Sequence, residues 1–151
     1  MNKENTLTIK FGKPEHGWLP TKLSYNDFEL SLDISDVPVD PMLQLCDSLI
    51  QITKGIKKPD RILWHLEPYC YYLQIEKMDS DYKVTLSESD SFESLAKITK
   101  EIRGSFEELI LPLYRGVNKF ASYSYLPPHW EELDLKRIDE LTDLIRKMKG
   151  M

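Results

Sequence analysis

Glycine, cysteine and long apolar runs are all scarce in this 151-residue chain. It contains six glycines and two cysteines, and the glycines form neither GxGxxG nor GxxxxGK[ST], the patterns whose loops hold phosphate groups. No uncharged run approaches the roughly 20 residues of a transmembrane helix. The opening MNKENTLTIK also lacks the apolar stretch of a signal peptide. We therefore expect a cytoplasmic protein with no membrane segment and no nucleotide held by a loop of this kind.

The cysteines and histidines do not have the spacing of a metal site. Cys46 and Cys70 have 23 residues between them and form no CxxC, and His16, His65 and His129 fall in three different expected elements. Structural zinc sites and disulfide scaffolds need closely spaced ligands or more cysteines. The sequence therefore predicts two reduced thiols, no metal and no other cofactor.

The composition is that of one globular domain. Hydrophobic residues make up 41% of the chain, aromatic residues 11% and charged residues 30%, which is too apolar for a disordered chain. The length suits one domain spanning 1–151, with no linker or repeat. The 25 acidic and 20 basic residues give a net charge of −5, which opposes unspecific binding to nucleic acid or to anionic membranes.

Alternating apolar residues predict strands in two parts of the chain. A short strand is expected over 6–11, and in 21–34 a turn at Asn26–Asp27 would pair the flanking strands. Residues 61–87 predict a three-stranded meander whose first turn lies at Pro68–Tyr69. That turn would pair Ile62 with Ile75, Trp64 with Leu73 and Leu66 with Tyr71, and a second turn would pair Leu73 with Leu86 and Ile75 with Val84.

Three helices are expected to accompany these strands. Asp40 is a suitable N-cap for a helix over 41–53 that ends before a glycine. Asp90, with a glutamate three residues later, indicates a second helix that Pro112 kinks or ends. Leucine and isoleucine at helical spacing predict a third within 131–150. The expected fold is a single α+β domain, an antiparallel sheet with three helices packed mainly on one face.

Three strings of the sequence resemble small bacterial proteins of the immunity type that are found beside polymorphic toxins. They are GKPEHGWLP, FELSLDISDVP ahead of DPMLQLCDSL, and WHLEPYCYYLQIE. The resemblance covers about residues 10–115. It implies a small α+β fold and a protein partner, and it carries over no catalytic residue.

Acidic residues are concentrated in 21–50, where six carboxylates accompany one lysine. One interpretation is structural: Asp40 caps a helix, Asp27 forms a turn and the others keep the surface soluble. The other is a docking face for a basic protein, formed by Glu29, Asp33 and Asp36 with Trp18. Tryptophan is also a common interface anchor, so Trp18 and Trp130, which lie in proline-flanked loops, either cap the core or contact a partner.

A different class of function is suggested by the outward face of the second β unit. The expected register sets His65 opposite Tyr72 and Glu67 opposite Cys70, residue types that can bind a small ligand or perform acid–base chemistry. A wetted sheet face accounts for the same residues. A carboxylate beside Cys70 also disfavours a reactive thiolate. The leading hypothesis is therefore a non-enzymatic protein-binding module, with a small-ligand binder or small enzyme using His65, Glu67 and Tyr72 as the alternative.

Overall fold

The computed structural model describes residues 6–91, 95–123, 129–130 and 133–150. Within these residues, seven strands form one antiparallel sheet in chain order: β1 (Thr8–Phe11), β2 (Trp18–Tyr25), β3 (Phe28–Ser35), β4 (Ile62–His65), β5 (Cys70–Lys77), β6 (Tyr82–Ser89) and β7 (Lys97–Gly104). The helices are α1 (Pro41–Thr53), α2 (Leu111–Ala121) and α3 (Leu135–Lys149), and a π-helical turn, η1 (Phe106–Ile110), leads into α2. The predicted α+β class is confirmed.

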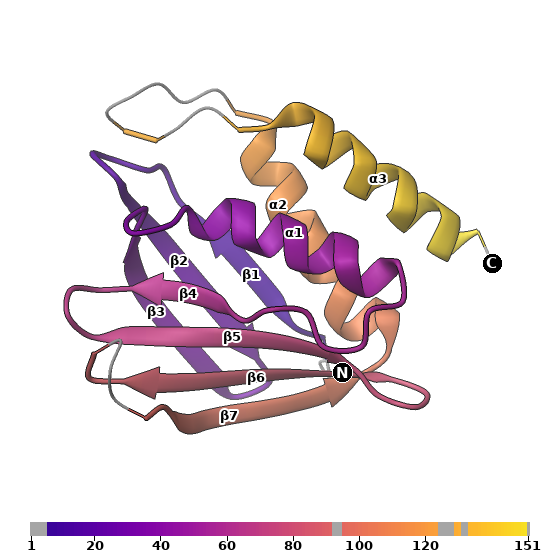
Figure 1. Cartoon of the computed structure of the whole chain (residues 1–151), viewed down its shortest axis with the longest axis horizontal. Coiled ribbons are helices and arrows are strands. Elements are labelled where there is room, and N and C mark those ends of the chain that lie inside the picture. Colours follow the sequence, from indigo (N-terminus) through magenta and orange to yellow (C-terminus); the bar gives the residue numbers. More distant parts are fainter. Residues whose placement is uncertain (1–5, 92–94, 124–128, 131–132, 151) are drawn as a thin grey trace.

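The three helices lie on one side of the sheet, as Figure 1 shows. Helix α1 packs on β4 and β5, and α2 packs beside β1. Helix α3 packs against α1 and α2 and so forms an outer layer. The arrangement agrees with the prediction of an antiparallel sheet covered mainly on one face.

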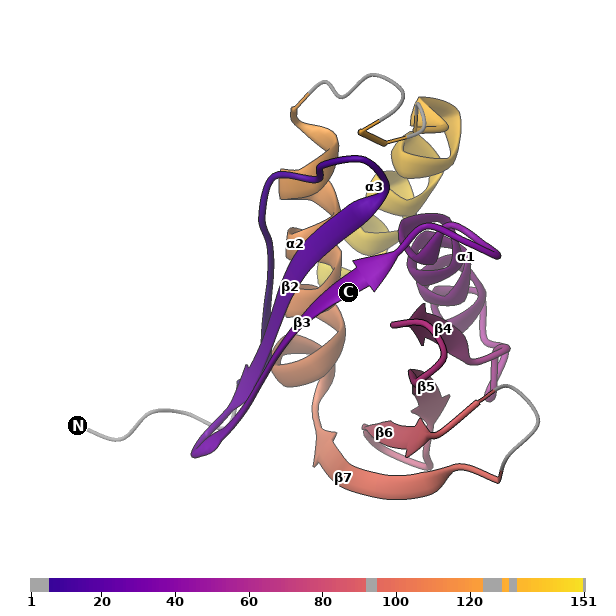
Figure 2. The same ribbon diagram turned by 90° about the vertical axis from the view of Figure 1, so that its left-hand side faces the viewer.

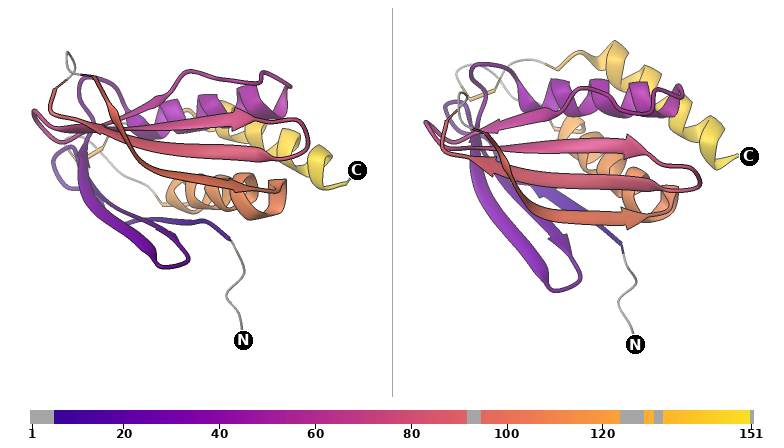
Figure 3. Two further views of the ribbon diagram at one scale, coloured as in Figure 1. Left: turned by 90° about the horizontal axis from the view of Figure 1, so that it is seen from below. Right: turned by 60° about the horizontal axis from the view of Figure 1, so that its bottom comes forward.

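The sheet is bent between β3 and β4. These strands share one registered pair, Ser35 with His65, whereas β2 pairs with β3 along its full length. The group β1–β3 therefore diverges from the group β4–β7 (Figures 2 and 3). As a result, Phe28, Leu30 and Leu32 on the inner face of β3 are only half-buried.

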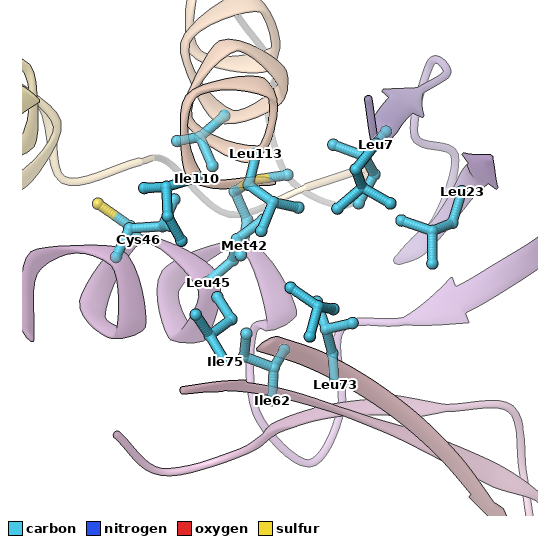
Figure 4. Close-up of a cluster of buried hydrophobic side chains, with 14 of the residues drawn as sticks. Leu7, Leu23, Met42, Leu45, Cys46, Ile62, Leu73, Ile75, Ile110 and Leu113 are labelled. Atoms are coloured by element: carbon cyan, nitrogen blue, oxygen red, sulfur yellow. The ribbon is translucent and has the colours of Figure 1, made fainter. Parts of the chain in front are cut away.

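One hydrophobic core lies between the sheet and the helices. In the close-up of Figure 4, side chains from α1 such as Met42 and Leu45 face side chains of β4 and β5. The residues predicted to point toward the helices, namely Trp64, Leu73, Ile75, Val84 and Leu86, are all at most 1% exposed. Burying a side chain of this size contributes about 1.5–3 kcal/mol to folding. This part of the prediction is confirmed.

The predicted pairing is correct in two hairpins and wrong in a third. β2 and β3 pair with the expected register around Asn26–Asp27, and β5 and β6 pair Leu73 with Leu86 as expected. In the β4–β5 hairpin, however, Trp64 lies opposite Tyr71, two residues from the predicted partner. The turn lies one residue earlier than predicted, at Glu67–Pro68, and the Leu66 N–H donates to the Tyr69 carbonyl across it at 2.7 Å. A shift of two residues keeps every side chain on its expected face.

The helix predicted from Asp90 is wrong. Residues 97–104 form β7, which pairs with β6 and satisfies the backbone groups that would otherwise line the edge of β6. The helical segment begins later, with Ser105 as the N-cap of η1. The Ser105 hydroxyl accepts from the Glu108 N–H, and the Glu108 carboxylate accepts from the Ser105 N–H. Pro112 sits in the first turn of α2, and the Glu108 carbonyl, four residues before it, accepts from the Leu7 N–H instead.

Candidate partner-binding surface

A tight turn at the start of β2 directs Trp18 outward. His16 and Gly17 have φ values of 50° and 84°, the positive values that a two-residue type I′ turn requires. Glu15 and Trp18 flank the turn and exchange two backbone hydrogen bonds of 3.0 Å. The turn therefore places a carboxylate residue and a tryptophan side by side. The His-Gly dipeptide is the sequence signal that would have identified Glu15.

Two hydrogen bonds to His129, which precedes a core residue, hold the turn in place. The Gly17 N–H donates to the His129 carbonyl at 2.9 Å, and the His16 N–H donates to His129 Nδ1 at 3.2 Å. The adjoining Trp130 is 1% exposed and packs edge-on against Phe120. Trp130 thus caps the core, whereas Trp18 is 38% exposed.

Asp36 is held beside the same turn. Its N–H donates to the Gly17 carbonyl at 2.9 Å, and a Cβ atom added to Gly17 would lie 2.7 Å from Asp36 Oδ1. Any side chain at position 17 would therefore displace the carboxylate. Glycine is needed here both for the positive φ and for the space.

Asp33 and two exposed valines complete the surface around Trp18. Trp18 lies opposite Ser35 and Asp33 opposite Pro20, so Trp18 and Asp33 share the outer face of the hairpin as diagonal neighbours, about 7–8 Å apart at Cα. Figure 1 places the start of β2, the end of β3 and the start of α1 at one end of the molecule. Between β3 and α1, Val37 and Val39 are 51% and 41% exposed. We call this set the Trp18 surface: Glu15, Trp18, Asp33, Asp36, Val37 and Val39.

Glu29 lies apart from the Trp18 surface. It pairs with Ser24 near the far end of the hairpin, about 20 Å from Trp18 at the usual rise of a strand. Its carboxylate lies 3.2 Å from Lys22 Nζ. Lys22 in turn lies opposite Lys10 of β1. The outer face of β1–β3 therefore carries mixed charge toward the hairpin turn.

The remaining acids of the 21–50 segment have structural roles. Asp40 accepts hydrogen bonds from two N–H groups in the first turn of α1, as its expected capping role requires. Asp47 pairs with Arg137 of α3, and this hydrogen bond raises the pKa of Arg137. Asp27 occupies the β2–β3 turn. The acidic residues that are close together in the sequence therefore lie in several separate parts of the fold.

His65, Glu67 and Tyr72 occupy three local environments. His65 Nδ1 lies 3.0 Å from the Val37 carbonyl oxygen, and Glu67 lies in the β4–β5 turn with a φ of 58°. Tyr72 is 7% exposed beneath the Arg61 guanidinium, whose carbon lies 3.6 Å from the ring centroid. Burial raises the pKa of Tyr72, which keeps its hydroxyl protonated at neutral pH. The observed register sets His65 opposite Cys70 instead of Tyr72.

Both cysteines are free and buried. Cys46 is 2% exposed and Cys70 is fully covered. Burial, reinforced by the Asp47 charge, raises the pKa of Cys46 to about 12. In the described part of the chain, no group of three or more His, Cys, Asp or Glu residues could hold a metal ion.

We expect neither thiol to react rapidly with iodoacetamide in the native protein at pH 8. The thiolate is the reactive form, and a raised pKa keeps Cys46 protonated at that pH, while burial excludes the reagent from Cys70. Intact mass should show slow modification of the folded protein and rapid double modification in concentrated urea. Rapid native labelling at either position would contradict this placement.

Comparison with known proteins finds no matching family model, no similar curated protein and no similar solved structure. Among the helices described, none has the length and apolar character to cross a membrane.

Proposed function

We propose that the protein is a non-enzymatic binding module of the immunity type, which docks a basic protein through the Trp18 surface. The exposure of Trp18 is the observation that carries the proposal. Trp18 is 38% exposed, and Val37 and Val39, in the segment between β3 and α1 at the same end of the molecule, are also exposed. Apolar side chains gathered on a surface and rimmed by polar residues are typical of protein interaction sites, and tryptophan is enriched among the residues that contribute most to binding.

The charge of the Trp18 surface favours a basic partner. Glu15 and Asp33 are exposed and Asp36 is half-buried, so three carboxylates adjoin Trp18. Complementary charge accelerates association and selects among partners. A toxin that cleaves nucleic acid fits this description, because its substrate groove must be cationic to bind phosphates.

The proposal is tested by binding kinetics on two variants. The wild-type protein would first be used to capture the partner, which would then be purified. The binding kinetics of the purified partner would be measured with the wild type, with Trp18→Ala and with Asp33→Lys. We expect Trp18→Ala to weaken binding about thirtyfold, since a tryptophan at the centre of an interface contributes about 2 kcal/mol or more. Asp33→Lys should lower the association rate severalfold at low salt, and added salt should reduce the difference.

Asp139→Lys is the matched control, because it makes the same change of charge at an exposed position of α3. It should leave the association rate close to that of the wild type. The stability of Asp33→Lys should change by no more than about 0.5 kcal/mol, as for most surface substitutions. Equal binding of wild type, Trp18→Ala and Asp33→Lys would overturn the proposal.

A further inference from the structure

A groove lies between β1 and α2, on a part of the molecule separate from the Trp18 surface. Its volume is about 380 Å³, within the range of small-molecule sites. Leu7, Ile9 and Phe11 line it from the β1 side, and Pro112 and Phe120 line it from α2. Figures 1 and 2 show α2 beside β1. The walls of the groove are therefore largely apolar.

Gly116 sets the close approach of the two walls. A Cβ atom at this position would lie 2.5 Å from Ile9 Cγ2 and 3.2 Å from the Ile9 carbonyl oxygen. Phe11 and Phe120 pack edge-to-face nearby, with ring centroids 5.9 Å apart. The groove is thus bounded by packed side chains on both sides.

Two cations of α2 rim the groove in a protein whose net charge is −5. Arg115 and Lys119 come from α2 and are exposed, whereas Lys10 of β1 points to the outer face of the sheet beside Lys22. Among the described residues that line the groove none is acidic, and no ion pair of Arg115 or Lys119 occurs in the described part of the chain. An anionic head group would therefore meet uncompensated positive charge.

The backbone around the groove favours an alkyl chain over a peptide. A peptide that added a strand to β1 would need free N–H and C=O groups along its edge. The Leu7 N–H already donates to the Glu108 carbonyl at 2.9 Å, and the Ile9 carbonyl faces Gly116 of α2. A peptide strand would therefore lack ladder partners at Leu7 and Ile9, whereas an alkyl chain needs no such partners.

We propose that the groove binds a medium-chain fatty acid. The alkyl chain lies in the groove along the contact of β1 with α2, and the carboxylate lies beside Arg115 and Lys119. The volume of about 380 Å³ is at the lower end of the range for ligand sites, which suits a medium chain. The site is independent of partner docking at the Trp18 surface, so either can fail without the other.

The test measures decanoate binding to the full chain by calorimetry, with 1-decanol as the uncharged ligand of the same length. We expect saturable binding of decanoate that is weakened about tenfold in Arg115→Gln/Lys119→Gln, because charge-assisted contacts to the carboxylate are lost. Binding of 1-decanol should be weak and unchanged by the double substitution. The control Lys57→Gln/Lys58→Gln removes two exposed charges from the loop before β4 and should bind decanoate as the wild type does.

A second measurement locates the ligand. A decanoate analogue carrying a diazirine on the chain should label peptides covering 6–11 and 112–123. Absence of saturable decanoate binding, equal weakening by both double variants, or labelling elsewhere would overturn the proposal. Binding of an acidic peptide at this groove in preference to decanoate would also overturn it.

Discussion

Replacing Trp64 by alanine is expected to lower the free energy of unfolding by about 3–5 kcal/mol. Trp64 is 1% exposed on the inner face of β4, opposite Tyr71 and beneath α1. Removing the indole leaves a cavity that the surrounding sheet and helix cannot fill without moving. Because the total stability of a domain is about 5–15 kcal/mol, this loss is about a fifth of it or more. Urea denaturation should show a lower midpoint with an unchanged slope.

Trp18→Ala is the matched control, since it deletes the same side chain from an exposed position. At 38% exposure, the Trp18 indole leaves no closed cavity, and we expect a loss of about 1 kcal/mol or less. The two variants should therefore differ in their effects, because Trp64→Ala lowers stability and Trp18→Ala weakens partner binding. Equal destabilisation by both would contradict the placement of the two tryptophans.

Elements specified by local chemistry could be predicted from the sequence. Asn26–Asp27 supplies the turn residues that fix the β2–β3 register. Asp40 and Pro41 define the start of α1, whose observed bounds equal those predicted. In both cases the determining residues lie within a few positions of the element that they specify.

Elements specified by contacts distant in the sequence could not be predicted from the sequence. Ile98, Ile102 and Phe106 recur at helical spacing, yet the first two belong to β7 because the edge of β6 offers backbone partners. Gly104 and Ser105 mark the actual boundary, through a capping box that the longer apolar pattern obscured. Tertiary pairing outweighs a helical preference that amounts to only a fraction of a kcal/mol per residue.

The candidate surface was predicted in part. Trp18, Asp33 and Asp36 were named from charge and residue type, and the fold places them at one end of the hairpin. Glu29 is separated from them because it lies four residues before Asp33 on β3, toward the hairpin turn and away from Trp18. Val37 was missed because the exposure of an aliphatic residue in a loop depends on the packing around it.

Replacing Gly116 by valine is expected to lower the free energy of unfolding by about 3 kcal/mol, and Gly116→Ala by about 1–2 kcal/mol. Two effects oppose each other in the alanine variant. Alanine favours a helix interior over glycine by about 1 kcal/mol, whereas overpacking a filled site costs about 1–3 kcal/mol. Overpacking should prevail, because the added Cβ would lie 2.5 Å from Cγ2 of Ile9, which is buried. Thermal or urea unfolding shows directly whether Gly116→Ala lowers or raises the free energy of unfolding.

Gly150→Ala tests whether the loss is local to the β1–α2 contact. Gly150 follows α3 with a φ of −80°, and the nearest atom to an added Cβ is 3.4 Å away, so its stability should change by less than about 0.5 kcal/mol. Ile9→Ala then completes a double-mutant cycle, because it removes the Cγ2 atom that the new methyl group meets. The combined variant Ile9→Ala/Gly116→Ala should be more stable than the sum of the single losses predicts, by about 0.5–3 kcal/mol. Strict additivity would mean that Gly116 does not set the distance between β1 and α2, and the walls of the groove would then have to be held by other contacts.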